Sequence, residues 1–242
     1  MEDIGADHFP ALRLDAGNDL FKKPAPVSAQ PRELAIAKGM MDIYVAMGYD
    51  AVAVGANDLA VGADLLTENT KMPWLSANLR DDQGKLLFPA SVVLTRGALR
   101  IGVVGLTGAV PTSQTGLRVD DWRPLLTERV KALRPDCHLL VALSNLSASD
   151  NAELMKNYPG IDLIITADAG RGNVVPRPEE KPWLVQTISQ GKALGVLTFA
   201  NPEPPSMSTN WQIKATTVPL KMTMPEDPVI AGMTERITQA AH

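Results

Sequence analysis

Residues 47–55, Met-Gly-Tyr-Asp-Ala-Val-Ala-Val-Gly, hold the pattern that decides the fold. The continuous apolar run of residues 51–54 predicts a buried β-strand that ends at Gly55. We expect one helix before it, over residues 32–47, and a second helix directly after it, over residues 58–66. Helix, strand, short loop and helix in this order are typical of an α/β domain with parallel strands.

The same alternation continues along the chain. Further helices are expected over residues 122–133, 149–158 and 227–240. Strands are expected over residues 12–15, 74–77, 91–95, 99–106, 138–143, 161–166, 183–187, 193–199 and 211–218, with a hairpin at residues 91–106. Because no linker or internal repeat divides the chain, we expect a single domain over residues 1–242.

The composition excludes several classes of function. The 242 residues carry a net charge of −4 and contain no run of Lys or Arg, so we expect no nucleic-acid partner. The apolar stretches fall far short of the roughly 20 residues that cross a bilayer, so we expect no membrane span. The first residues are acidic rather than basic and apolar, and they predict no signal peptide in the chain as given.

Polar residues follow four of the predicted strands. The four loops are residues 15–21, 55–62, 144–150 and 167–172. Because loops at the carboxyl ends of parallel strands converge, we expect the functional site there. The alternative is structural: Asn and Asp form turns, and Asn57 and Asp58 are suited to cap the helix expected after them.

Six segments, taken in order, carry a more specific signal. They are residues 14–21 ("LDAGNDLF"), 47–55 ("MGYDAVAVG"), 75–79 ("LSANL"), 99–107 ("LRIGVVGLT"), 139–144 ("LLVALS") and 160–165 ("GIDLII"). They resemble "LDAGDLF", the lead into "GNHE" or "GNHD", "SANL", "KIGVIGLT", "VVALSH" and "GIDLIIGGH" of the metallophosphoesterase (calcineurin-like) domain of the 5'-nucleotidase and UDP-sugar hydrolase family. The resemblance implies an α/β fold in which a two-sheet sandwich is flanked by helices. It also implies hydrolysis of phosphate esters by two divalent cations held by Asp, His and Asn.

The resemblance places unsuited residues at most of the metal-binding positions. The bridging aspartate falls on Asn18, or on Asp19 if the turn has one extra residue. The ligand asparagine falls on Ala56, which has no donor atom. The catalytic histidine falls on Asn57, with Asp58 in the acidic position, so these two residues mark the degenerate catalytic positions.

The later motifs and the start of the chain show the same loss. The histidine after the "VVALS" strand falls on Asn145, and the last two histidines fall on Asp168 and Gly170. Residues 1–10 are too few for the family's opening strand and its crossover helix. We therefore expect the first strand of the fold to be absent.

Two functions follow from this comparison. We expect a degenerate, non-catalytic domain that acts as a binding or scaffolding module, with a ligand-binding cleft formed by Asn18, Asp19, Asn57, Asn145 and Asp168. The alternative is an active phosphohydrolase on nucleotides or sugar nucleotides with an atypical metal site. We expect no cofactor. If a cation is bound, an oxygen-only set favours Mg, Ca or Mn, held by Asp19 and Asp168.

Partners and location depend on the same resemblance. Without a first strand, the strand at residues 12–15 would expose unpaired backbone groups that invite pairing with another chain. We therefore expect a protein partner at the N-terminal segment, residues 1–21, and a small phosphorylated ligand as a second possibility. The resemblance also implies an extracytoplasmic (periplasmic) location, and a chain that is a portion of a longer protein.

Overall fold

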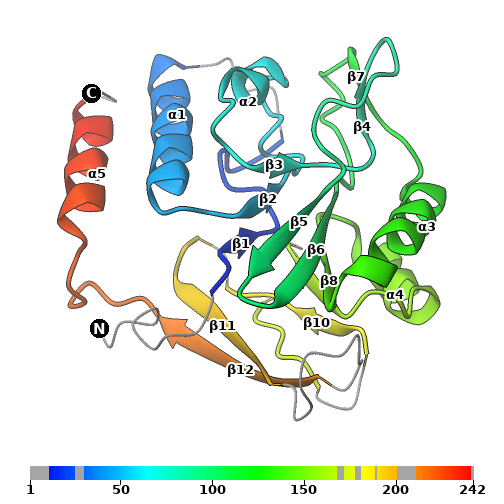
Figure 1. Cartoon of the computed structure of the whole chain (residues 1–242). Coiled ribbons are helices and arrows are strands. Elements are labelled where there is room, and N and C mark those ends of the chain that lie inside the picture. The colour runs from blue at the N-terminus through cyan, green and yellow to red at the C-terminus, as the bar shows by residue number, and fades with distance from the viewer. Residues whose placement is uncertain are drawn as a thin grey trace.

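The computed structural model describes residues 11–24, 30–167, 172–177, 181–188, 190–200 and 211–240. The strands are β1 (Leu14–Asp15), β2 (Ala51–Ala53), β3 (Trp74–Leu75), β4 (Leu79–Asp81), β5 (Ser91–Arg96), β6 (Leu99–Leu106), β7 (Leu117–Val119), β8 (Leu139–Ser144), β9 (Leu163–Thr166), β10 (Trp183–Val185), β11 (Ala193–Ala200) and β12 (Gln212–Pro219). The helices are α1 (Pro31–Ala46), α2 (Asp64–Glu68), α3 (Trp122–Leu133), α4 (Ala148–Asn157) and α5 (Pro228–Ala240), with a short 3-10 helix at Arg134–Asp136. Figure 1 shows their arrangement.

Two sheets form the centre of the fold. The first has the strand order β1-β2-β3 and is parallel, with Asp15 beside Val52 and Ala53 beside Leu75. The second has the order β10-β9-β8-β6-β5. Its strands are parallel except β5, which forms the predicted antiparallel hairpin with β6. The parallel strands bring their carboxyl ends to one edge of each sheet, where the polar loops begin.

Strand β2 shows why the two sheets pack face to face. Its successive side chains point to opposite faces of the sheet. Ala51 and Ala53 lie in one core with Val141 of β8, whereas Val52 lies in a second core with Met41 of α1. Helices α3 and α4 pack on the other face of the second sheet (Figure 1). The fold is thus the α/β two-sheet sandwich between helices that the sequence predicts.

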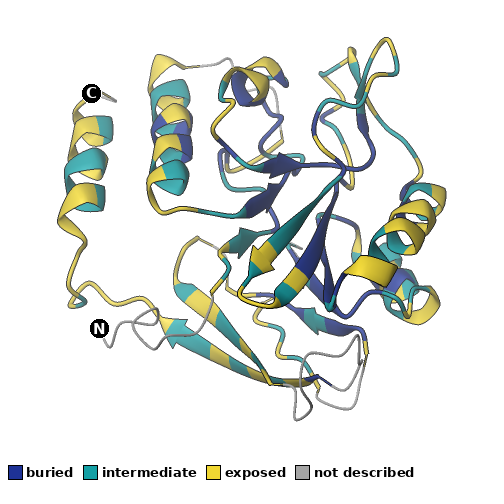
Figure 2. Ribbon diagram, viewed as in Figure 1, coloured by how far each residue is buried: buried dark blue, intermediate teal, exposed yellow. Residues whose placement is uncertain are grey.

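Burial follows these layers (Figure 2). Strand β8 is buried over its whole length, which explains its continuous apolar sequence. The hairpin of β11 and β12 adds Leu197, Phe199 and Ile213 to the core between the sheets. Helix α5, by contrast, has no buried residue. None of the described helices combines the length and the apolar character needed to traverse a bilayer.

Some predictions about the elements were incomplete or wrong. The helix expected over residues 58–66 is wrong, because residues 56–61 form turns and α2 begins only at Asp64. Strands β4 and β7, which pair antiparallel with each other, were not predicted. The expected absence of a first strand concerns residues 1–10, which lie outside the described residues. Among the residues that are described, β1 lies at the edge of its sheet.

Candidate functional site

The side chain of Asn18 joins four loops at the carboxyl ends of β1, β2, β8 and β9. Its Nδ2 donates to Oδ1 of Asn145 at 2.5 Å and to the carbonyl oxygen of Ala167 at 3.3 Å. Its Oδ1 accepts a hydrogen bond of 3.0 Å from the backbone N–H of Asn57. Nδ2 of Asn145 in turn donates to the carbonyl oxygen of Ala16. The two amide side chains therefore hold the loops together directly.

The backbone around Asn18 is shaped for this contact. Asn18 has a φ of 73°, in the left-handed region that Asn tolerates better than most residues. Gly17 precedes it with a φ of 82°, and a Cβ there would lie 2.1 Å from the carbonyl oxygen of Ala53. A Cβ on Gly55 would lie 2.3 Å from Oδ1 of Asn18. Both glycines are thus needed for the close approach of the first two loops.

The carboxylate of Asp58 lies beneath this contact and is fully buried. Its Oδ2 accepts the backbone N–H groups of Asn18 at 2.8 Å and Gly55 at 2.9 Å. Its Oδ1 accepts those of Asp19 at 2.8 Å and Leu20 at 3.1 Å. Burial raises the pKa of Asp58, and these four hydrogen bonds act in the opposite direction. Asp58 therefore joins the loops after β1 and β2 and does not cap a helix.

Two further carboxyl groups lie on the α1 side of the loop after β1. Oδ1 of Asp15 accepts the backbone N–H of Gly17 at 2.8 Å, and its Oδ2 accepts the hydroxyl of Tyr44 at 3.4 Å. Asp15 and Asp19 also share a side-chain hydrogen bond. Because two carboxyl groups can share such a bond only if one is protonated, one of them is neutral.

The electrostatic environment indicates which of the two carries the proton. Burial, followed by the charges of Asp15 and Asp58, raises the pKa of Asp19 to about 10. No donor among the described residues reaches the buried Oδ2 of Asp19, so a negative charge on this oxygen would be poorly stabilised. Burial also raises the pKa of Asp15, but its hydrogen bonds with Asp19, Gly17 and Tyr44 act against this rise. The pair therefore keeps one proton at neutral pH, and the balance of these effects favours Asp19 as its holder.

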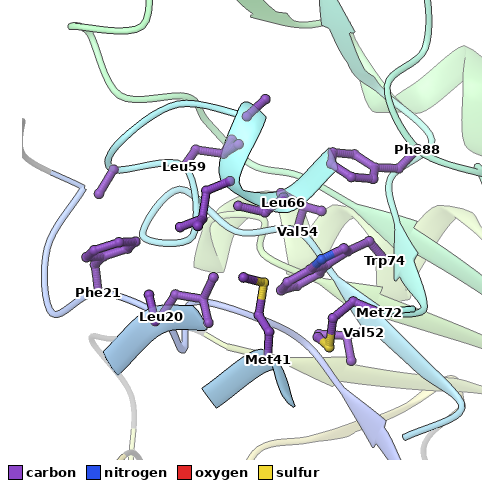
Figure 3. Packing of buried hydrophobic residues seen from close by; sticks show 14 of the residues in the cluster. Leu20, Phe21, Met41, Val52, Val54, Leu59, Leu66, Met72, Trp74 and Phe88 are labelled. Atoms are coloured by element: carbon purple, nitrogen blue, oxygen red, sulfur yellow. The ribbon is translucent and has the colours of Figure 1, made fainter. Parts of the chain in front are cut away.

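Apolar side chains anchor the loops after β1 and β2 in the core next to α1. Leu20 and Phe21 follow the acidic residues after β1, and Leu59 follows Asp58. All three are buried in one core with Met41 of α1 and Val54 at the end of β2 (Figure 3). The loops that carry the hydrogen-bonded network are thus packed against this apolar core, which limits how far they can move apart.

The donor atoms of this network do not fit a two-cation site. The side-chain oxygens of Asn18 and Asn145 already accept hydrogen bonds, and both oxygens of Asp58 are taken by backbone N–H groups. Ala56 has no donor atom. Within the described ranges, no three His, Cys, Asp or Glu side chains are grouped to hold a metal ion. Asp19 would first have to lose its proton, because a metal ion binds the carboxylate form.

The structure places the predicted site residues as follows. Asn18, Asn57 and Asn145 meet at the strand ends, while Asp58 and Asp19 lie beneath and beside them. Asp168 and Gly170 lie outside the described residues, so the metal pair of Asp19 with Asp168 and the full five-residue cleft stay predictions.

Asp15 and Tyr44 were not among the site residues predicted from the sequence. A signal for Tyr44 was present, because it follows the buried Ala37 and Met41 of α1 at helical spacing.

Comparison with known proteins supports the fold. By sequence, the chain matches no protein-family model and no curated protein. Its structure is similar to the sulfate thiohydrolase SoxB of Thermus thermophilus, with a TM-score of 0.70 and 23% identity over 95% of this chain and 42% of that chain. It is also similar to a 5'-nucleotidase precursor from Thermus thermophilus, with a TM-score of 0.68 and 21% identity over 84% of this chain and 45% of that chain. For the calcineurin-like phosphoesterase YfkN of Bacillus subtilis, the TM-score is 0.69 and the identity 18%, over 95% of this chain and 83% of that chain.

These similarities establish the fold. The chain spans less than half of the length of the first two proteins and most of that of the third. The chain therefore has the fold of a 5'-nucleotidase-type metallophosphoesterase domain.

Proposed function

We propose that this domain is a non-catalytic member of its fold class and acts as a binding or scaffolding module. The observation that supports this most directly is the side chain of Asn18, at the position where the resemblance implies an aspartate that bridges two cations. Its amide has one donor and one acceptor group, and both are used to join neighbouring loops. A neutral amide cannot offset the charge of two cations, so this position cannot hold the metal pair that would activate a water molecule as the nucleophile.

The remaining residues support the same proposal. Ala56 and Asn57 stand where the resemblance implies an Asn ligand and a catalytic His. Neither can transfer a proton near neutral pH, whereas hydrolysis of a phosphate ester needs a stabilised leaving group. Asp58 is buried under four backbone N–H groups and is out of reach of a substrate.

A hydrolysis assay tests the catalytic half of the proposal. The protein would be incubated with AMP, UDP-glucose and an aryl phosphate in the presence of Mn²⁺, Co²⁺, Zn²⁺ or Mg²⁺, and its metal content would be measured by elemental analysis. We expect no turnover and no stoichiometric metal. Metal-dependent turnover in the unchanged protein that disappears in Asp19→Asn, but not in the matched exposed variant Asp64→Asn, would establish the phosphohydrolase alternative.

The partner of the module is proposed from the edge of the first sheet. Strand β1 pairs with β2 on one side and lies at the sheet edge. The chain before it is tied down by Arg96, whose Nε donates to the carbonyl oxygen of Ala11 at 3.0 Å, and by Asp50, which accepts the N–H of Arg13 at 2.9 Å. A sheet edge held in place in this way is suited to pair with an extended segment of another protein.

Hydrogen exchange tests this partner site. We expect amide exchange in residues 11–21 to slow when a true partner is added, while exchange in α3 stays unchanged. Exchange in residues 11–21 that no candidate partner alters would count against the proposed edge contact. A small phosphorylated ligand would instead perturb Asn57 and Asn145 in an NMR titration with AMP. In keeping with the resemblance, we propose that the module works outside the cytoplasm, in the periplasm.

A further inference from the structure

Helix α5 is attached to the domain through one neighbour. It packs beside α1, and no other described element makes an extensive contact with it (Figure 1). None of its residues is buried, and the half-buried ones include Ile230, Met233 and Ile237, which form one stripe along the helix. The helix thus adheres to the domain through a single narrow face.

The contact with α1 is nevertheless specific in shape. Ile237 fills a depression on α1 at Gly39, where an added Cβ would lie 2.3 Å from Cγ1 of Ile237. A side chain of any size at position 39 would have to displace Ile237. The surface of α1 at Gly39 is therefore a socket for one residue of α5.

The segment that leads to α5 lies largely in solvent. Residues 220–227 are all exposed except Met224, which is half-buried. The N–H of Leu220 still donates to the carbonyl oxygen of Lys192, and beyond it the N–H of Met224 makes a local turn with the carbonyl oxygen of Lys221. Pro225 and Pro228 favour an extended backbone at the residue before each of them, and Pro228 is the first residue of α5. A segment of this length can reach at most about 28 Å when extended.

The helix also carries its own N-terminal cap. Oδ1 of Asp227 accepts the backbone N–H groups of Val229 at 2.8 Å and Ile230 at 3.1 Å. Because this cap belongs to the connecting segment, α5 keeps it when the helix leaves α1. The helix and its cap can thus move as one unit.

We propose that α5 exchanges between two copies of this chain, so that Ile237 of each copy occupies the Gly39 socket of the other. The exchanged contact is identical to the contact within one chain, so neither copy loses packing. The partner is a second copy because the socket fits the sequence of α5 itself. This interaction surface lies on α1 and is independent of the loops around Asn18, so it does not rest on the proposed function.

Disulfide trapping between two different variants tests the exchange. In a Cys137→Ala background, which removes the single native cysteine, one chain would carry Gly39→Cys and the other Ile237→Cys. Under mild oxidation of the mixture, the disulfide between Cys at position 39 of one variant and Cys at position 237 of the other, identified by mass spectrometry, forms efficiently only if α5 of one copy reaches α1 of the other. We expect this covalent dimer. Replacing Ile237→Cys by Glu235→Cys, on the exposed side of α5, should abolish it.

A second measurement does not depend on trapping. The unmodified chain should have twice the monomer mass by light scattering, and Gly39→Leu should return it to the monomer mass with an unchanged near-UV spectrum. The matched variant Gly116→Leu, whose Cβ would meet nothing within 4 Å, should remain dimeric. A chain that is monomeric up to its solubility limit overturns the proposal. A dimer that persists in Gly39→Leu also overturns it, because that dimer would use another surface.

Discussion

The backbone N–H of Asn18 lies 2.8 Å from Oδ2 of Asp58, so the loop after β1 is bound to the first turn of the loop after β2. Three more N–H groups, those of Gly55, Asp19 and Leu20, converge on the same carboxylate. One buried charge thus sets the relative position of two loops that lie about forty residues apart in the sequence.

We predict that Asp58→Asn lowers the free energy of unfolding by about 2–4 kcal/mol, because an amide NH₂ group would face backbone N–H donors in a buried place. Urea denaturation would measure this loss. Asp64→Asn changes an exposed acidic residue at the start of α2 and should cost less than about 1 kcal/mol. Equal losses in the two variants would show that the hydrogen bonds to Asp58 contribute little.

A second prediction concerns pH. The pKa of Asp19 is raised from 3.8 to about 10 by burial and by the charges of Asp15 and Asp58. The folded protein therefore keeps a proton that the unfolded chain releases above about pH 4. The stability from this group is complete below about pH 4 and is lost as the pH rises towards 10. Unfolding free energies should accordingly fall between about pH 5 and pH 9.

Replacing Asp19 separates this effect from other titrations. Asp19→Asn mimics the neutral carboxyl group and can still donate to Asp15, so its stability should depend less on pH and should exceed that of the unchanged protein at about pH 9. Asp42→Asn, at an exposed position of α1, serves as the control and should leave the pH dependence unaltered. If Asp19→Asn keeps the full pH dependence, Asp19 does not hold the proton.

A third prediction restores the charge at position 18. Asn18→Asp removes the donor to Asn145 and Ala167 and adds a negative charge to loops that already hold the carboxyl groups of Asp15, Asp19 and Asp58, which should cost about 1–3 kcal/mol. Mn²⁺ should recover part of this loss in Asn18→Asp and none of it in Asn18→Ala. An equal effect of Mn²⁺ on the melting temperature of the unchanged protein would instead indicate a cation site that uses other ligands.

A fourth prediction tests the close approach of the loops. Gly55→Ala would place a Cβ 2.3 Å from Oδ1 of Asn18 and 2.5 Å from Oδ1 of Asn145, and we expect a loss of about 1–3 kcal/mol. The same change in an Asn18→Ala background should cost less, because one of the two obstructing groups is gone. Identical costs in both backgrounds would show that the clash lies elsewhere.

Much of the framework could be predicted because burial determines the sequence pattern there. Strand β8 is apolar from Leu139 to Leu143 since both of its faces are covered, and α3 has the predicted bounds, residues 122–133. The start of α2 was missed because Asp58 resembles a helix cap in sequence. Its actual partners include Asn18, Asp19 and Leu20, about forty residues away. Pairings across such distances leave no periodic signal.

The candidate site, like the framework, could be predicted only in part from the sequence. From the rule that loops converge at strand ends, the sequence predicts that Asn18, Asn57, Asn145 and Asp168 lie together. In the structure the side chains of Asn18 and Asn145 are hydrogen-bonded and the backbone N–H of Asn57 joins them, while Asp168 lies outside the described residues. The proton shared by Asp15 and Asp19 could not be predicted, because it depends on how deeply both carboxyl groups are buried against α1. Residue identity alone does not report that depth.

Because Asn18 and Asn145 join the loops by a hydrogen bond, the arrangement of these loops does not depend on the supply of metal ions. Loops held by bound cations open when a chelator or a scarce environment removes those ions, and the shape then depends on what the surroundings provide. Because two amides hold these loops through the hydrogen bond between Asn18 and Asn145, we expect the loops to keep their spacing in the presence of EDTA and under metal starvation. If these loops form a binding surface, as we propose, that surface should bind its partner equally well in metal-rich and metal-poor surroundings.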